Sequence, residues 1–287
     1  MTLCKLFVWF IMYSFMGWVY ESIYCTIKNR HWENRGFLHG PIVPIYGVGA
    51  LLASIVFFIL PIEGLRDANP LTIFIICFLG SIVLEYSTSW ALEKLFHAYW
   101  WDYSNVILNI NGRVCLPASI GFGLAGILVT KVIYPFVNNI TIGIPPMLME
   151  FLALLFMLIF AMDLSLTISA LTNFTKNFAR IETEINDQIA AAYQKLDTSV
   201  SGAIETVVEK SEQLQEGATA RKETAEEKIA ALREQLTTER LESLFLTSSK
   251  SQKRTMLSIQ GFRKNEPASA IRQRMRTMME EKKHSKS

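Results

Sequence analysis

Apolar residues in the first part of the chain come in five runs of about 20, separated by short segments rich in proline, glycine, asparagine and charge. A helix needs about 20 apolar residues to cross ~30 Å of hydrocarbon, because each residue adds about 1.5 Å. The pattern therefore predicts an all-α protein, a polytopic transmembrane helix bundle of about five spans. The expected spans are 3–27, 42–60, 70–93, 117–137 and 147–172.

Charge divides the chain into three parts. Residues 1–175, the predicted transmembrane bundle, hold eight basic and nine acidic residues, a net charge of −1. Residues 176–246 hold nine basic and fourteen acidic residues, and residues 247–287 hold eleven basic and three acidic, so their net charges are −5 and +8. The bundle is thus followed by an acidic part and then by a basic tail.

Small and apolar residues recur along the acidic part from Ile181 onward in steps of 4, 4 and 3. This 11-residue period, about 3.67 residues per turn, is typical of a straight or slightly right-handed helical seam. We predict a cytoplasmic helix or coiled coil over 176–246 that self-associates into a homo-oligomer or binds a partner, with a single solvated helix as the alternative. No proline occurs between Pro146 and Pro267, so nothing obliges the last span to end before this extension.

Residues 247–287 read as a basic amphipathic segment or a disordered tail. As an amphipathic segment, the tail would bind anionic lipids.

Basic residues gather in alternate connections between the predicted spans. The first connection contains Lys28, Arg30 and Arg35, and the third contains Lys94 and Arg113. The positive-inside rule then predicts a multi-pass protein of the cell (cytoplasmic) membrane, with its N-terminus outside and its C-terminus in the cytoplasm.

Two pairs of spans share a spacing. Gly36 and Gly112 are each followed five residues later by proline, and Tyr46-Gly47 meets Phe122-Gly123 in the same register. The segments 3–60 and 70–137 are therefore predicted to be two copies of one helix–loop–helix unit, and the span 147–172 lies outside the repeat.

Three acids fall in the cytoplasmic third of their predicted spans: Glu21, Glu85 and Asp163. Inserting a carboxylate into a membrane costs about 2.5–3.5 kcal/mol at the centre of the helix, and within the span it stays costly unless it is paired, hydrated or protonated. We predict that the three acids line a polar cavity that binds substrate from the cytoplasmic side, and the alternative is that they only form ion pairs within the bundle. Further candidate substrate-binding residues lie at the cytoplasmic rim: Arg35, His39, His97, Asp102, Asn111 and Arg113.

Motifs of standard enzymes are absent from the sequence. It contains no phosphate-binding loop, no H-E-x-x-H and no G-x-S-x-G, and its four cysteines lack metal-ligand spacing. We therefore expect no cofactor and no metal and assign no catalytic residue, and whether the protein is an enzyme stays open. If ATP drives it, a separate ATPase subunit must hydrolyse the nucleotide.

Several motifs together resemble one known family. They are Tyr13–Glu21, Asn34–Pro41, Pro44–Gly47, Trp100–Ser104 and Asn111–Arg113. In this combination the chain resembles the bacterial ABC-transporter type IV permease family over residues 3–172. The resemblance implies a bacterial membrane protein that acts as a transporter permease, without naming a substrate.

The preferred hypothesis is a permease component that moves a small polar or charged solute across the membrane bilayer. One alternative is a membrane-embedded enzyme that acts on a lipid headgroup, with His39 or His97 and a carboxylate as acid and base. The other is a membrane anchor for a cytoplasmic coiled-coil interaction module.

Overall fold

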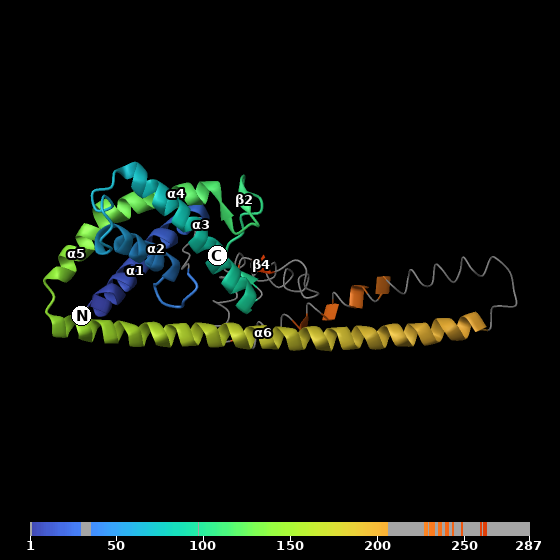
Figure 1. The fold of residues 1–287 in the computed structure, drawn as a ribbon. Coiled ribbons are helices and arrows are strands. Elements are labelled where there is room, and N and C mark those ends of the chain that lie inside the picture. Colours follow the sequence, from blue (N-terminus) through green and yellow to red (C-terminus); the bar gives the residue numbers. More distant parts are fainter. Residues whose placement is uncertain are drawn as a thin grey trace. The chain divides into compact units, whose positions relative to one another are not determined.

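The computed structural model describes residues 2–29, 36–96 and 98–205, together with scattered positions between 227 and 262. This part of the chain is mostly helical (Figure 1). Its α-helices are α1 (Thr2–Asn29), α2 (Pro44–Ser54), α3 (Pro70–Phe96), α4 (Leu116–Leu128), α5 (Tyr134–Ile142) and α6 (Pro146–Glu205). Two π-helical segments, η1 (Ile55–Ile59) and η2 (Val129–Ile133), continue α2 and α4, and four two-residue strands are β1 (Ala98–Tyr99), β2 (Asn109–Ile110), β3 (Val114–Cys115) and β4 (Gly261–Phe262).

Four helices are long and apolar enough to cross a membrane: Thr2–Ile27, Pro70–Phe96, Leu116–Ile142 and Pro146–Asn173. They confirm four of the five predicted spans. The third of them combines α4, η2 and α5, and its π-helical turn lies just before Pro135. A local widening of the helix at this point accommodates a proline, which lacks the backbone N–H of a regular helix.

The expected span 42–60 is shorter in the structure. It consists of the 11-residue α2 and the five-residue η1, so the apolar helix runs from Pro44 to Ile59. Prolines set both ends, because the residue before a proline is driven into extended conformation. Val43 and Leu60 both have extended backbone angles, and Pro61 follows Leu60. At about 1.5 Å per residue this helix is ~24 Å long, shorter than a hydrocarbon core of ~30 Å.

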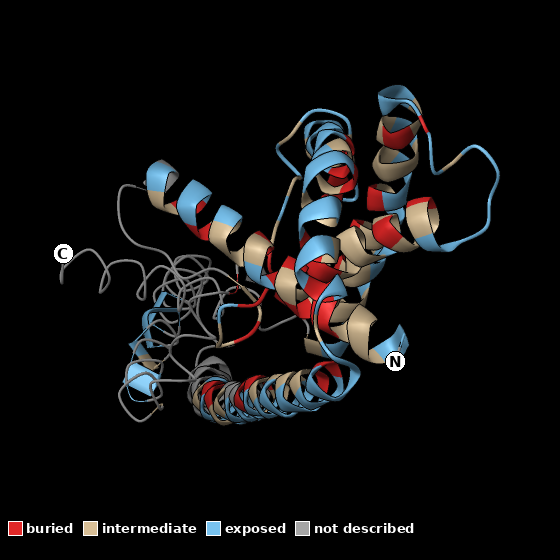
Figure 2. Ribbon diagram, turned by 90° about the vertical axis from the view of Figure 1, so that its left-hand side faces the viewer, coloured by how far each residue is buried: buried red, intermediate tan, exposed pale blue. Residues whose placement is uncertain are grey.

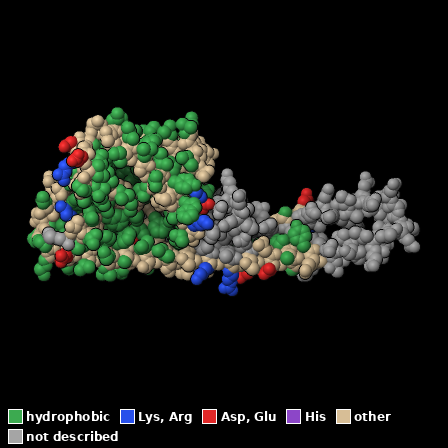
Figure 3. Space-filling view, viewed as in Figure 1, with side chains coloured by type: hydrophobic (Ala, Val, Ile, Leu, Met, Phe, Trp, Pro, Cys, Tyr) green, Lys and Arg blue, Asp and Glu red, His purple; other side chains and the backbone are tan. Residues whose placement is uncertain are grey.

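The outer surface of the bundle is apolar. Large aliphatic side chains such as Val83, Leu124 and Leu154 are 57–70% exposed. Figure 3 shows hydrophobic side chains over much of the bundle, and Figure 2 shows buried residues where helices meet. Exposed apolar side chains of this kind are what lipid chains require of the helices that face them.

Close contacts at glycine join consecutive helices. A Cβ atom on Gly47 of α2 would lie 2.9 Å from the Phe10 ring of α1, and a Cβ atom on Gly123 of α4 would lie 2.7 Å from the Phe74 ring of α3. Small residues let membrane helices approach in this way.

Hydrogen bonds between buried side chains add to these contacts. Tyr13 Oη and Ser54 Oγ are 3.0 Å apart between α1 and α2, and Trp9 Nε1 donates to Thr141 Oγ1 at 2.9 Å between α1 and α5. These bonds satisfy the Trp9 N–H and the Tyr13 hydroxyl, whereas the Ser54 and Thr141 hydroxyls also donate to backbone carbonyls of their own helices.

The connection between α3 and α4, described over residues 98–115, folds into a compact segment that we call the hairpin. Strands β2 and β3 pair with Asn109 opposite Cys115, and the turn between them uses Asn111 and Gly112 at φ 53° and 68°. Asparagine and glycine are the residues that tolerate this left-handed conformation. Strand β1, which opens the connection, pairs with β4 from much later in the chain.

The chain forms two compact units. The first comprises 1–171 with 254–263, and the second comprises 172–253 with 264–287. Helix α6 has 60 residues and continues from the last membrane-length segment to Glu205 without a break. The second unit has buried Ile185 and Ile189, and Glu184 forms ion pairs with Arg180 and Arg240. The coiled coil and the basic tail lie largely outside the described residues and stay predictions.

Candidate functional site

Glu85 of α3 is a buried acid at the centre of the candidate site. Glu85 is only 3% exposed, and its Oε2 atom has no hydrogen-bond partner in the described part of the chain. Buried polar atoms in proteins are nearly always hydrogen-bonded, and an isolated carboxylate in an apolar bundle is costly. The free oxygen therefore marks a position for a ligand or a proton.

Other polar side chains from separate elements surround Glu85. The Tyr103 hydroxyl, from the connection between α3 and α4, is within hydrogen-bonding reach of the Glu85 carboxylate. Electrostatic interactions also join Tyr46 of α2 to Glu85, Tyr103 and Glu21 of α1. We call these four residues, Glu21, Tyr46, Glu85 and Tyr103, the Glu85 cluster. It brings together α1, α2, α3 and the hairpin.

Tyr103 is the hydrogen-bond donor in this cluster. Burial raises the pKa of its phenol well above the usual value, and the negative charge of Glu85 raises that pKa further. The hydroxyl therefore keeps its proton at neutral pH and donates a hydrogen bond to the carboxylate. One oxygen of Glu85 is thus stabilised while Oε2 stays available.

Aromatic rings border the cluster at Tyr46. The Tyr46 ring contacts Tyr20 of α1 at 6.2 Å and Phe122 of α4 at 5.9 Å between ring centroids. Gly17 of α1 leaves the space that the Tyr46 side chain fills. The Tyr46 side chain is therefore packed against α1 and α4.

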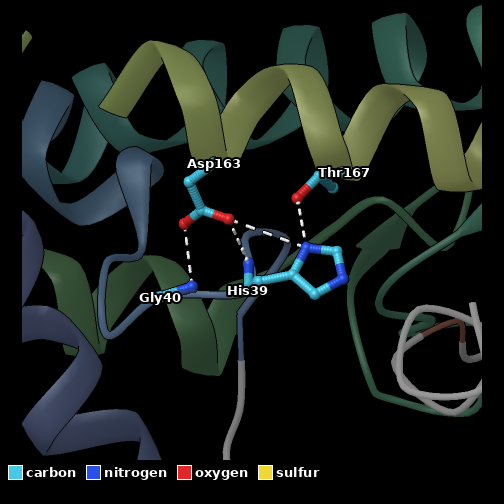
Figure 4. Close-up of polar contacts among 4 residues, drawn as sticks. All are labelled: His39, Gly40, Asp163 and Thr167. Atoms are coloured by element: carbon cyan, nitrogen blue, oxygen red, sulfur yellow. Dashed lines mark hydrogen bonds and ion pairs between the residues drawn. The ribbon is translucent and has the colours of Figure 1, made fainter. Parts of the chain in front are cut away.

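Asp163 of α6 makes a different set of contacts, shown in Figure 4. Its carboxylate accepts hydrogen bonds from the backbone N–H groups of His39 and Gly40 at 2.9 and 2.8 Å. The His39 ring Nδ1 lies 2.7 Å from Thr167 Oγ1 and 3.6 Å from the Asp163 carboxylate. We call this arrangement the Asp163 latch. Both carboxylate oxygens accept hydrogen bonds from the backbone of the loop that precedes α2, so Asp163 fastens that loop to α6.

The rim residues of the hairpin hold it against the end of α3. Arg113 forms an ion pair with Glu93 at 2.5 Å and lies over the Tyr86 ring at 5.1 Å. Asn111 Nδ2 is 3.4 Å from the Tyr86 hydroxyl, and Asp102 accepts a hydrogen bond from the Ser104 backbone at 2.8 Å. These contacts position the segment that carries Tyr103.

Of the predicted site residues, Glu21 and Glu85 meet in the Glu85 cluster, His39 and Asp163 form the latch, and Asp102, Asn111 and Arg113 organise the hairpin. Arg35 and His97 lie outside the described residues. Sequence reasoning missed Tyr46 and Tyr103 as site residues. Among the described positions, no three His, Cys, Asp or Glu side chains converge as metal ligands would.

Four membrane-length apolar helices with an apolar outer surface define a multi-pass membrane protein. The model of one family, described as "Putative ABC-transporter type IV", matches residues 8–168. The match covers more than half of the chain, and the protein belongs to this family. The search of curated proteins and the search of solved structures found no match to the chain.

Proposed function

We propose that this protein is a permease component that moves a small polar or charged solute across the cytoplasmic membrane, and that the solute binds at the Glu85 cluster. The observation that carries the proposal is the buried Glu85 carboxylate, whose Oε2 atom has no partner among the described residues. Ionisable residues inside membrane helices mark substrate or ion pathways by default, because the cost of placing them there needs a return in function.

The position of the cluster supports transport. Its four residues come from three helices and one connection, so a relative movement of these elements would open or close the site. Transporters of many folds bind their substrates between such helix pairs. The family also supports a transport role, and it favours a separate ATPase subunit as the partner.

The remaining candidate residues support the site in this proposal. The Asp163 latch holds the loop before α2, and Tyr46 lies in the first turn of that helix. The Arg113–Glu93 ion pair holds the hairpin, which carries Tyr103. Arg35 and His97 stay candidates for the entrance at the cytoplasmic rim.

The test is release of solutes from liposomes that contain the full chain. The liposomes are loaded with a mixture of amino acids, polyamines, sugars and inorganic ions, and mass spectrometry follows what leaves. We expect at least one of these solutes to leave faster than from protein-free liposomes. Glu85→Gln should slow that release about tenfold or more, because it removes a charge-assisted contact.

Glu150→Gln is the matched control, since Glu150 is an exposed acid of α6 outside the cluster. It should release solute at the rate of the unmodified protein. Unchanged release by Glu85→Gln would contradict the assigned site. Failure of the whole mixture to leave faster than from protein-free liposomes would contradict the permease role.

A second candidate function is a membrane anchor for an interaction module. The unbroken course of α6 from its membrane-length segment to Glu205 favours it, because one helix joins the bundle to the second unit. Deletion of residues 176–253, which spares residues 254–263 of the first unit, separates the two functions, since a permease would keep its solute release and an anchor would lose its partner. The lipid-headgroup enzyme has less support, because both Asp163 oxygens beside His39 already accept backbone hydrogen bonds.

A further inference from the structure

We propose that the solute bound by the Glu85 cluster is an organic cation with an amine or quaternary ammonium headgroup, held between the free Glu85 oxygen and the aromatic rings around Tyr46. The proposal rests on the proposed function and names the substrate class of the same site.

The sign of the charge follows from the groups at the site. Among the described residues, the side chains that interact electrostatically with Tyr46 and Tyr103 include the Glu85 carboxylate, the phenol of Tyr20 and the thiol of Cys115. None of these three described groups carries a positive charge, and the Glu85 carboxylate repels an anion and attracts a cation. Glu85 Oε2 is the acceptor that such a cation would use.

The organic nature of the cation follows from the rings. Tyr46 stands between Tyr20 and Phe122, with centroid distances of 6.2 and 5.9 Å. Aromatic faces attract ammonium groups, and this attraction is the usual basis for recognition of choline-like ligands. A small metal ion needs several convergent oxygen or nitrogen ligands instead, and the described residues offer no group of three acidic, histidine or cysteine side chains arranged for one.

The burial of Glu85 also favours an organic cation over a small inorganic ion. Glu85 is 3% exposed, so a bound ion would have to shed most of its water before reaching Oε2. Alkylammonium ions hold water less tightly than small inorganic ions and regain contact with the rings, so their entry costs less.

The experiment measures binding to the purified full chain in lipid nanodiscs by titration calorimetry. The probes are tetramethylammonium and choline, with sodium, potassium and acetate ions as comparisons. We expect saturable binding of the two organic cations and none of the comparison ions. Glu85→Gln should weaken the binding of choline about tenfold or more, whereas Glu150→Gln should leave it unchanged.

Two variants of Tyr46 test the aromatic contribution. Tyr46→Phe keeps the ring and Tyr46→Leu removes it, so Tyr46→Phe should bind choline more tightly than Tyr46→Leu does. Gel filtration and helical circular dichroism show whether each variant is folded. Equal loss of binding in both Tyr46 variants would contradict the role of the ring.

The remaining outcomes each decide one point. Equal binding of sodium or potassium ions, binding of acetate, or absence of saturable binding by both organic cations would overturn the proposal. Binding of choline unchanged by Glu85→Gln would overturn the site. Choline binding without release of choline from liposomes loaded with it would support the cation site and contradict the permease role. Glu85-dependent release of a neutral or anionic solute would keep the permease and reject the cation.

Discussion

Asp163 and Gly40 illustrate how a single contact is set at the residue scale. The Asp163 carboxylate accepts two backbone hydrogen bonds, and a Cβ atom on Gly40 would lie 2.9 Å from Asp163 Oδ2. Gly40→Ala should therefore push the loop from α6 and destabilise the protein by about 1–3 kcal/mol, as loss of a charged hydrogen bond does. The measurement is thermal unfolding in detergent.

Gly143→Ala is the control for this prediction. A Cβ atom on Gly143 would meet nothing within 4 Å, and its φ of −84° suits any residue. Its unfolding temperature should stay close to that of the unmodified protein. An equal effect of the two substitutions would show that the latch does not stabilise the loop.

Residue types and positions alone pointed to Glu21 and Glu85 as site residues, because acids within apolar runs stand out. The sequence did not point to Tyr46 and Tyr103. Both tyrosines lie close to predicted membrane boundaries, where tyrosine has an ordinary interfacial role. Only the folded hairpin brings Tyr103 back to Glu85. The sequence grouped Asp163 with the other two acids, whereas the structure shows its carboxylate bound to the backbone of residues 39 and 40.

At the scale of the elements, the helix pairs show a recurring contact. Phe10 stands 11 residues before Glu21 and packs on Gly47, while Phe74 stands 11 residues before Glu85 and packs on Gly123. The duplication of the segments 3–60 and 70–137 stays a prediction, and this shared contact supports it.

Gly47→Ala tests the packing of the first pair. The added methyl group would overlap Ser14 and Phe10 of α1, so we expect a loss of stability of about 1–3 kcal/mol from overpacking. Gly80→Ala in α3 is the control, because its methyl group would meet nothing within 4 Å and alanine favours a helix. The unfolding temperatures of both variants in detergent decide the matter. A Gly47→Ala variant as stable as Gly80→Ala would mean that α1 can shift without cost.

Hydropathy predicted four spans well and overestimated the length of the second predicted span, 42–60. The apolar run 42–60 contains no charge, so its composition alone does not reveal where the helix ends. Pro44 and Pro61 decide its ends through the conformation of the residue before each of them. The π-helical turns η1 and η2 have no signature in the apolar pattern, because they arise from local backbone geometry.

At the scale of the whole molecule, the short helix Pro44–Ile59 decides the topology. If it crosses with the four longer helices, the two termini lie on opposite sides, and if it does not, they lie on the same side. We predict that it crosses, with its ~24 Å matched by local thinning of the bilayer. The positive-inside rule then puts the C-terminus in the cytoplasm and the N-terminus outside.

Reporter fusions at each terminus measure this arrangement. Green fluorescent protein fluoresces only in the cytoplasm, and alkaline phosphatase is active only outside it. We expect the C-terminal fusion to fluoresce and the N-terminal phosphatase fusion to be active. Fluorescence from fusions at both ends would show that Pro44–Ile59 does not cross.

The unbroken course of α6 has a mechanical consequence. Its 60 residues correspond to about 90 Å of continuous helix, with no proline to absorb torsion. A movement of the loop before α2, which is fastened to Asp163, would therefore act on a helix that has no proline at which to bend.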